Sequence, residues 1–312
     1  MTQAPPPLPN AVRLREVGPR DGFQNEPERI DTADKVRLIE LLGATGLRRL
    51  EITSFVRADV IPQLADGVEV LDAVRLPDTV ARSVIVPTPK GLDRALEQRD
   101  RMEQITVFLS ASETHNRRNV NRSVDESLAG LRTMLPRIRE AGLRAGAAVS
   151  TAFGCPYEGA VDPDHVAALS RALVDAGADE LVFGDTTGMA NPVQVRAFFR
   201  SLRDELGPDV ELTAHFHNTR GQGLANVLAA LEGGCMSFES SFGELGGCPV
   251  PAGATGNIAT EDLVSMLHEM GVETGVDLPA LLRATEEVQR VLGRPLASHT
   301  LVAGPIEWTP AA

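Results

Sequence analysis

Strand-like and helix-like patterns alternate eight times between about residues 11 and 270, which predicts an α/β protein, a (β/α)8 TIM barrel with an additional C-terminal helix. The first predicted strand ends in GPRDG, whereas a doubly wound open sheet, the competing architecture, typically carries GxGxxG at this point. No linker or shift in composition divides residues 11–291. We therefore expect a disordered lead over residues 1–10, a barrel domain over 11–293 and a tail over 294–312.

The predicted strands are short runs rich in apolar and β-branched residues, at 11–17, 49–55, 81–87, 105–110, 143–151, 180–184, 209–217 and 236–240. Helical periodicity follows each strand, at 32–42, 68–74, 92–97, 123–141, 163–176, 192–206, 221–231 and 258–270, and a last helix is expected at 278–291. Some helix ends carry their own signals. Ser123 and Glu126 have the spacing of a capping box, and Gly142 follows the end of that helix.

The composition is that of a globular protein with a sizeable core, because 43% of the 312 residues are hydrophobic. The sequence contains no apolar run of about 18 residues, so no membrane span is expected. The start, MTQAPPPLPN, lacks the basic residues and the apolar stretch of a secretory signal, and it favours a disordered or polyproline lead.

Charge and cysteine usage disfavour several classes of partner and site. A net charge of −13 disfavours nucleic acid and anionic membranes, although a few local arginines would still bind an anionic substrate. The three cysteines Cys155, Cys235 and Cys248 do not suggest a disulfide framework, which favours the reducing cytoplasm. No CxxC is present, so a structural zinc site is not expected, and Cys235 is expected to be a buried, inert thiol.

Two histidines in the predicted strand 209–217 point to a metal site. His215 and His217 are two residues apart, so both side chains lie on one face of an extended strand. An isolated pair of this kind is about as often one packed and one exposed histidine, so a further ligand is needed. Asp21 follows the first strand, and the carboxyl ends of all barrel strands meet at one rim. Two neutral nitrogens and a carboxylate suit a divalent cation with open positions for substrate and water.

Other polar residues occur where predicted strands end, as expected at the mouth of a functional barrel. They are Arg20 and Asp21 after the first strand, Glu51 and Thr53 on the second, and Asp185 and Thr186 after the sixth. Each has a simpler alternative, because Asp21 could cap a turn, Glu51 could be an exposed strand residue, and Asp185 could cap the next helix. Together with His215 and His217 on the seventh strand, these residues place polar groups at four strand ends. A barrel without activity would not need them, so a catalytic mouth is favoured.

Six stretches carry a resemblance to a known family: EVGPRDGFQNE (16–26), LEITSFV (50–56), FGCPYEG (153–159), FGDTTG (183–188), HFHN (215–218) and GELGGCPVPAGATGNIATEDLV (243–264). With them the chain resembles the hydroxymethylglutaryl-CoA lyases, within the wider group of metal-dependent Claisen-type barrel enzymes. RDG and HxH are shared with isopropylmalate and homocitrate synthases, whereas GCPYEG and the long last motif point to the lyases.

The resemblance implies a metal site and a reaction. Asp21, His215, His217 and Asn257 match the metal ligands of the family, and the oxygen ligands favour Mg²⁺ or Mn²⁺. The implied reaction is a reverse Claisen cleavage of 3-hydroxy-3-methylglutaryl-CoA to acetyl-CoA and acetoacetate. A lyase for another 3-hydroxyacyl-CoA is the alternative. A Claisen synthase is less expected, because such enzymes commonly carry an extra C-terminal regulatory region.

The same resemblance implies roles for further residues. Arg20 matches an arginine that polarises the substrate carbonyl, and Glu51 and Asp185 match acidic residues that orient the site. Cys248 matches a lid cysteine that takes part in proton transfer, with His215 as the alternative proton donor. The surrounding GELGGCPVPAG is rich in glycine and proline, which is typical of an exposed, mobile loop.

The loop predicted after the fourth strand, SASETHNRRNVNRS (110–123), is the expected site of the CoA moiety. Arg117, Arg118, Asn119 and Arg122 fall in this segment, and its arginines would bind the CoA phosphates. A solvated loop without a ligand is an equally good interpretation. The remaining histidines are expected to be surface or packing residues: His115, His165, His268 and His299.

Three positions depart from the family pattern. The family more often reads HxHDTYG where this chain has Asn218 and Arg220, and a small residue is usual at the position of Glu244. No metal ligand is lost, but these three differences mean that the sequence does not identify the acyl group of the substrate. A homodimer formed through the last helices is a further expectation from the resemblance.

Overall fold

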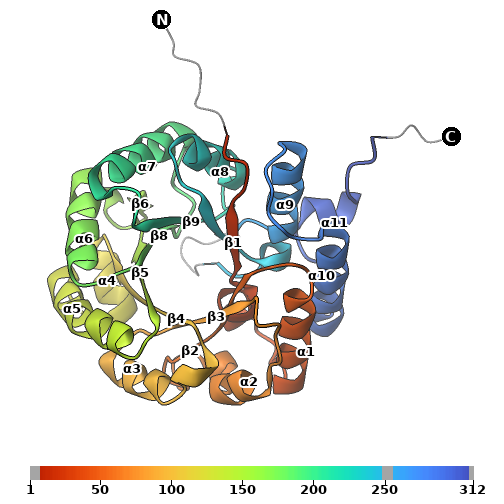
Figure 1. The fold of residues 1–312 in the computed structure, drawn as a ribbon, viewed down its shortest axis with the longest axis horizontal. Coiled ribbons are helices and arrows are strands. Elements are labelled where there is room, and N and C mark those ends of the chain that lie inside the picture. The colour runs from red at the N-terminus through yellow and green to blue at the C-terminus, as the bar shows by residue number, and fades with distance from the viewer. Residues whose placement is uncertain (1–7, 248–255, 309–312) are drawn as a thin grey trace, which may run out of the picture.

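Eight parallel strands close into a barrel that is surrounded by helices (Figure 1). The computed structural model describes residues 8–247 and 256–308. The closed barrel confirms the predicted (β/α)8 fold, and most predicted elements lie within a few residues of the observed ones.

The barrel strands are β1 (Arg13–Glu16), β2 (Arg49–Ser54), β3 (Ala81–Ile85), β4 (Gln104–Ser110), β5 (Arg144–Ser150), β8 (Glu180–Asp185), β9 (Glu211–Phe216) and β10 (Ser237–Ser240). A small hairpin is formed by β6 (Gly154–Cys155) and β7 (Gly159–Ala160). The helices along the barrel are α1 (Thr32–Gly43), α2 (Gly67–Ala73), α3 (Pro89–Leu96), α4 (Glu113–Val120), α5 (Val124–Glu140), α6 (Pro163–Asp175), α7 (Pro192–Leu206) and α8 (Gly223–Glu232). They are followed by α9 (Thr260–Glu269), α10 (Leu278–Leu292) and α11 (His299–Ala303).

Strand β10 closes the barrel by pairing with both β1 and β9. Around the barrel the strands follow the order β1-β10-β9-β8-β5-β4-β3-β2. In this register Glu239 of β10 lies opposite Arg15 of β1 on one side and opposite His215 of β9 on the other. Residues paired in this way point to the same side of a parallel sheet, so closure of the barrel brings these three side chains together.

A cluster of phenylalanines packs α7 against the barrel. The ring of Phe198 lies 4.8 Å from that of Phe153 and 5.0 Å from that of Phe183, both edge to face. Phe199 joins the cluster at 5.9 Å from Phe183. Such pairs contribute about 1 kcal/mol each beyond the burial of their area. The cluster holds the end of β8 and the segment after β5 in place beside the mouth of the barrel.

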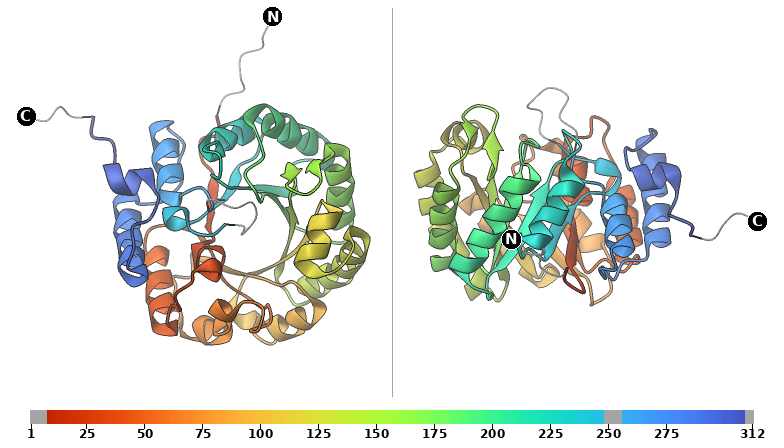
Figure 2. Two further views of the ribbon diagram at one scale, coloured as in Figure 1. Left: turned by 180° about the vertical axis from the view of Figure 1, so that it is seen from behind. Right: turned by 90° about the horizontal axis from the view of Figure 1, so that it is seen from above.

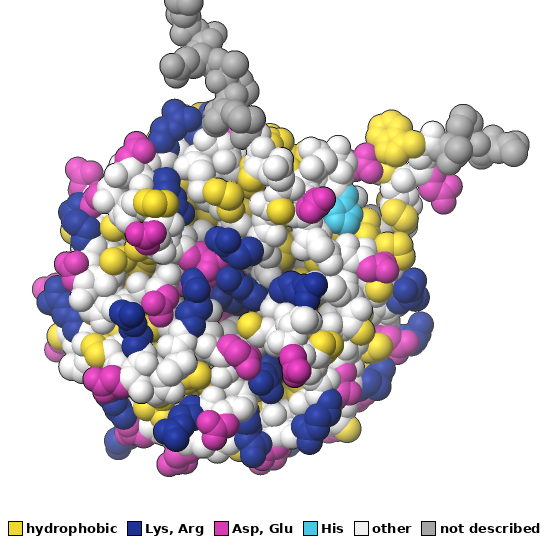
Figure 3. Space-filling model, viewed as in Figure 1, with side chains coloured by type: hydrophobic (Ala, Val, Ile, Leu, Met, Phe, Trp, Pro, Cys, Tyr) yellow, Lys and Arg dark blue, Asp and Glu magenta, His cyan; other side chains and the backbone are white. Residues whose placement is uncertain are grey.

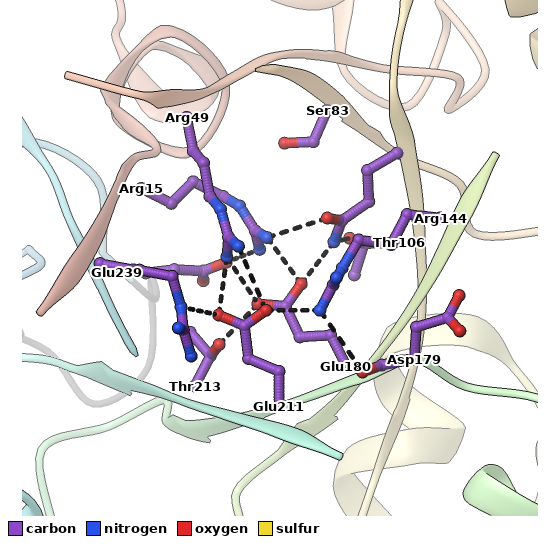
Figure 4. Close-up of polar contacts among 12 residues, drawn as sticks. Arg15, Arg49, Ser83, Thr106, Arg144, Asp179, Glu180, Glu211, Thr213 and Glu239 are labelled. Carbon is purple, nitrogen blue, oxygen red and sulfur yellow. Dashed lines mark hydrogen bonds and ion pairs between the residues drawn. The ribbon is translucent and has the colours of Figure 1, made fainter. Parts of the chain in front are cut away.

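The barrel interior is charged toward the amino-terminal ends of the strands (Figure 4). Arg15 donates to Glu239 at 2.7 Å and to Glu180 at 2.6 Å, and all three side chains are buried. Glu211, at the start of β9, accepts from Arg49 at 2.8 Å. Lys and Arg side chains also gather near the middle of this end of the barrel in the space-filling view (Figure 3). The buried charges named here are therefore paired, which offsets the cost of burying them.

One predicted loop is a helix. The segment 110–123 is predicted without regular structure, but most of it forms α4, so this prediction is wrong. Ser112 caps the helix by accepting from the backbone N–H of His115 at 3.1 Å, and Asn121 ends it in the left-handed region at φ 55°. The helix is polar and short, so it has no apolar periodicity by which a sequence pattern finds helices. The β6–β7 hairpin is also absent from the prediction.

The last three helices pack at one edge of the barrel (Figures 1 and 2). Helix α10 contacts α1 and α9, and α11 contacts α9. Asp262 of α9 anchors α11, because it accepts from the side chain of Ser298 at 2.9 Å and from the backbone N–H of Thr300 at 2.6 Å. Within the described ranges, no helix is both long and apolar enough to cross a membrane.

Candidate active site

A cavity of about 370 Å³ lies at the carboxyl-terminal mouth of the barrel. This is the end at which barrel enzymes carry their sites. Its polar lining includes Arg20, Asp21, Glu51, His115, His215 and His217. Its apolar lining includes Val56, Ile61, Pro87 and Val120. A cavity with convergent polar groups and an apolar part is typical of a small-molecule site.

Three predicted metal ligands converge in this cavity. One ligand atom each from Asp21, His215 and His217 lies within 4.8 Å of the others. The Nε2 atoms of the two histidines are 3.1 Å apart, so both rings direct this nitrogen to a common point. Asp21 arrives from η1 (Gly18–Gly22), a tight helical turn directly after β1 whose residues are all buried. The barrel thus brings Asp21, which follows β1, next to the two histidines at the end of β9, the seventh barrel strand along the chain.

The fourth predicted ligand, Asn257, is buried beside Asp21. Its side-chain nitrogen donates to Asp21 at 2.7 Å and to the carbonyl of Leu245 at 3.0 Å. Its Oδ1 is buried and has no hydrogen-bond partner among the described residues. A buried carbonyl oxygen without a partner needs an explanation, and a cation is one. Two imidazole nitrogens, a carboxylate and this amide oxygen form a donor set that fits a divalent metal ion.

The surroundings of Asp21 and His217 favour the forms of these two ligands that bind metal. Burial alone would raise the pKa of Asp21, but the charges of Arg20 and of the two histidines lower it to about 2. Burial and the neighbouring His215 lower the pKa of His217 to about 3. At neutral pH Asp21 is therefore a carboxylate and His217 a neutral imidazole, which are the ligating forms.

His215 has a carboxylate partner that the sequence reasoning missed. Its Nδ1 lies 2.9 Å from Oε2 of Glu239. Burial alone would lower the pKa of His215, but the hydrogen bond and the charge of Glu239 raise it. Burial alone would raise the pKa of Glu239, but the hydrogen bond from His215 and the charge of Arg15 lower it to about 2. The available signal was a lone glutamate inside the predicted strand 236–240, where a barrel-facing position is normally apolar.

Arg20 and Glu51 form a buried ion pair on the lining of the cavity. The guanidinium donates through Nε to Glu51 and through Nη1 to Asp21, the latter at 2.6 Å. Burial alone would lower the pKa of Arg20, but the charges of Glu51 and Asp21 raise it above its ordinary value. Burial raises the pKa of Glu51. Arg20 is thus a permanent positive charge that its two acidic neighbours hold in place.

Asp185 is buried but is absent from the residues that line the cavity. Its Oδ1 accepts from the backbone N–H groups of Met189 at 2.7 Å and Ala190 at 3.1 Å. Burial raises the pKa of Asp185 to about 6. The carboxylate therefore holds the turn between β8 and α7. Cys248, the predicted proton donor, lies outside the described residues.

The predicted CoA-binding residues on α4 face different surroundings. Arg117 is exposed and pairs with Glu113 at 2.7 Å, and the guanidinium of Arg118 lies 4.1 Å from the ring centre of Tyr157. Of the four residues named for CoA, Asn119 is found in the lining of the cavity, whereas Arg117, Arg118 and Arg122 are not. The structure therefore places α4 at the mouth, with its two arginines outside the cavity lining.

Two further side chains have environments that the sequence did not reveal. His115, expected as a surface or packing residue, is buried, lines the cavity and has its Nδ1 at 2.6 Å from the hydroxyl of Ser110. Burial lowers its pKa, so it is a neutral imidazole at pH 7. Cys155 is buried with its Sγ at 3.0 Å from the hydroxyl of Ser112. Burial raises the pKa of Cys235 to about 12, which agrees with an inert thiol.

Of the three residues that depart from the family pattern, Asn218 and Glu244 contact each other, and Arg220 has other partners. The side chain of Asn218 donates to the carboxylate of Glu244, and Glu244 adopts a positive φ of 62°. Arg220 donates to the carbonyls of Thr187 and Gly188, both at 2.8 Å. Asn218 and Glu244 are thus a coupled pair, and Arg220 braces the turn after β8.

Comparison with known proteins agrees with this geometry. The family model described as HMGL-like matches residues 11–288. A hydroxymethylglutaryl-CoA lyase of Bacillus subtilis is 45% identical over 95% of this chain and 98% of its own length. The (R)-citramalyl-CoA lyase of Chloroflexus aurantiacus is 41% identical over 95% of this chain and 96% of its own length. A solved HMG-CoA lyase of Acinetobacter baumannii, in complex with coenzyme A and 3-methylmalate, has a TM-score of 0.91 at 38% identity, covering 97% of this chain and 98% of that one. The chain therefore belongs to the HMGL-like family.

Proposed function

We propose that this protein is a divalent-metal-dependent carbon–carbon lyase that cleaves 3-hydroxy-3-methylglutaryl-CoA to acetyl-CoA and acetoacetate. The observation that carries the proposal is the convergence of Asp21, His215 and His217 in one cavity, next to the permanently charged Arg20. Relatives that are 40–45% identical over most of this chain are named lyases of this substrate, which supports the same reaction here.

The proposed metal ligands are Asp21, His215, His217 and Asn257, and the proposed ion is Mg²⁺ or Mn²⁺. A bound ion of this kind lowers the pKa of a coordinated hydroxyl group and polarises carboxylate and carbonyl oxygens. The protein supplies the orientation, because Asp21 is held by Arg20 and Asn257, and His215 is held by Glu239.

The chemistry assigned to the side chains follows the electron flow of the cleavage. The tertiary hydroxyl gives its proton to solvent water, and its oxygen becomes the ketone oxygen of acetoacetate as the C2–C3 bond breaks. The electron pair of that bond forms the enolate of acetyl-CoA. Arg20 would stabilise the enolate oxygen with a positive charge that Glu51 keeps in position. The enolate carbon then takes a proton from Cys248. His215, the alternative donor expected from the sequence, would have both ring nitrogens engaged as a metal ligand, Nδ1 by Glu239 and Nε2 by the ion.

The remaining assignments complete the proposal. Asp185 acts as a positioning residue through the turn between β8 and α7. CoA would bind over α4, with Asn119 at the cavity and Arg117 and Arg118 toward the phosphates. A homodimer and a cytoplasmic location stay predictions from the family resemblance and from the cysteine usage.

The proposal is tested by incubating the protein with Mg²⁺ or Mn²⁺ and 3-hydroxy-3-methylglutaryl-CoA and measuring acetoacetate. We expect turnover of about 1 s⁻¹ or faster, abolished by EDTA and by Asp21→Ala. The variant Asp125→Ala, at an exposed acid on α5, is the matched control and should keep full activity. EDTA-resistant turnover, or full activity of Asp21→Ala, would remove the metal from the mechanism. (R)-Citramalyl-CoA, the substrate of one relative, is assayed in parallel. If the protein cleaves this thioester and not 3-hydroxy-3-methylglutaryl-CoA, the proposed cleavage reaction stands and the proposed substrate is wrong.

A further inference from the structure

We propose that Arg15 and Glu239 form a positioning pair that locks His215 in the tautomer whose Nε2 faces the metal site. This inference rests on the proposed function, because it assumes that His215 ligates a metal ion through Nε2. It assigns a role in the site to a buried ion pair in the interior of the barrel, beneath the proposed ligands.

The geometry leaves His215 one arrangement of its ring hydrogen. Oε2 of Glu239 lies 2.9 Å from Nδ1 of His215, while Oε1 accepts from Nη1 of Arg15 at 2.7 Å. A carboxylate that faces an arginine is ionised, so it accepts hydrogen bonds and has no hydrogen to donate. The hydrogen of a neutral His215 is therefore on Nδ1, and Nε2 presents a lone pair.

Arg15 cannot turn away from Glu239, because other buried groups hold it. Its Nη2 donates to Glu180 at 2.6 Å and to the side-chain oxygen of Gln104 at 3.2 Å, and its side chain is 1% exposed (Figure 4). The parallel register adds a second constraint, since Glu239 lies opposite both Arg15 and His215. The carboxylate is thus fixed between its partners, with one oxygen assigned to each.

The second histidine lacks this arrangement. Nδ1 of His217 is buried and has no hydrogen-bond partner in the described part of the chain. The tautomer of His217 is therefore not imposed by a protein acceptor, whereas that of His215 is. This asymmetry predicts that His215 is the ligand through which the barrel interior tunes metal affinity.

A substitution of nearly equal shape separates tautomer control from packing. In Glu239→Gln the single side-chain oxygen is claimed by Arg15, which can only donate, so the amide NH₂ faces Nδ1 of His215. The ring must then accept at Nδ1 and carry its hydrogen on Nε2, where it blocks coordination. An amide in place of such a carboxylate stabilises the wrong imidazole tautomer in other histidine sites as well. We expect the affinity for Mn²⁺ to fall 10- to 100-fold or more.

The double variant Arg15→Met with Glu239→Gln is the matched control. Without the guanidinium, the amide can turn its oxygen to Nδ1 of His215 and restore the ligating tautomer. Affinity should recover at least tenfold relative to Glu239→Gln, although a second buried group has been changed. If Glu239 has a purely structural role, the double variant should bind Mn²⁺ more weakly than Glu239→Gln, because it removes more native contacts.

The experiment is a titration of the metal-free proteins with Mn²⁺, in which free ion is followed by electron paramagnetic resonance. Equal affinity of wild type and Glu239→Gln, or loss in Glu239→Gln without recovery in the double variant, would overturn the proposal.

Histidine ¹⁵N NMR of the metal-free wild type, at a pH where the ring is neutral, gives a test that needs no variant to fold. We expect hydrogen on Nδ1 of His215, and hydrogen on Nε2 would overturn the proposal. A wild type that shows this tautomer but binds no Mn²⁺ would refute the metal site and leave the positioning pair standing.

Discussion

Replacing Glu211 by Gln should destabilise the fold through the amino-terminal end of the barrel. The carboxylate accepts from Arg13 at 2.7 Å and from Arg49 at 2.8 Å, and it also pairs with Arg144. The side chain of Glu211 is 7% exposed, so solvent screens its ion pairs only weakly. Glu211→Gln keeps the shape of the side chain but leaves these guanidinium groups facing a neutral amide (Figure 4).

The magnitude follows from the pKa of Glu211. Burial alone would raise this pKa, but the hydrogen bond and charge of Arg49 and the charges of Arg13 and Arg144 lower it from 4.5 to about 2. Because the pKa is lower in the folded than in the unfolded chain, the stabilisation is fully present above pH 4.5 and is lost as the pH falls toward 2. At about 1.4 kcal/mol per unit it amounts to about 3 kcal/mol at pH 7, or roughly 5 °C in Tm for a chain of this length.

The assay is urea and thermal unfolding of wild type and Glu211→Gln at pH 7, repeated in steps from pH 4.5 toward pH 3. The variant should be less stable by about 3 kcal/mol at pH 7, and the difference should narrow as the pH falls. Glu140→Gln, at an exposed residue of α5, is the matched control and should unfold like wild type. Equal stability at pH 7, or a difference that does not depend on pH, would refute this reasoning.

Three further predictions concern the proposed site and its surroundings. Cys248→Ser should slow turnover by about 10²- to 10⁴-fold with unchanged metal content by elemental analysis, and an unchanged rate would leave Cys248 without a role in proton transfer. Replacing Arg117 and Arg118 together by Ala should raise the KM of the thioester with little change in kcat, and an unchanged KM would place CoA elsewhere. Burial raises the pKa of Glu16 from 4.5 to about 8, so wild type should lose stability relative to Glu16→Gln as the pH rises through this range, by up to about 1.4 kcal/mol per unit. Urea unfolding at pH 5 and pH 8.5 measures the difference, and a constant value would contradict the assignment.

The barrel was predictable because its helices bury one face and so leave a periodic pattern in the sequence. Its strands are buried on both faces and appear as short, nearly continuous apolar runs between the helices. Helix α4 shows the limit of such patterns. It is anchored by Asn116, whose side chain donates to Ser127 at 2.7 Å and accepts from the backbone N–H of Ser110 at 2.9 Å. Polar anchors of this kind depend on which elements lie nearby, so they produce no repeating signal within the helix.

The candidate site was predictable to the extent that its residues stand at strand ends. Asp21, His215 and His217 follow from the HxH spacing and from the rule that barrel strands end at one rim. Glu239 and His115 were not found, because their partners are set by strand register and by a helix that the pattern missed. Arg117 and Arg118 were chosen for their charge, and charge alone does not show whether a side chain reaches the cavity.

The sequence by itself determined the order of strands and helices, the family and the residue types available at the mouth, since these depend on local periodicity and on motifs. Only the tertiary structure decided the electrostatic state of the site. Closing the barrel places Arg15 against Glu239 and Glu239 against His215, and it buries Asp21 beside Arg20. The physical reason is that a pKa or a tautomer depends on burial and on neighbours within a few ångströms, and those neighbours are far apart in the chain.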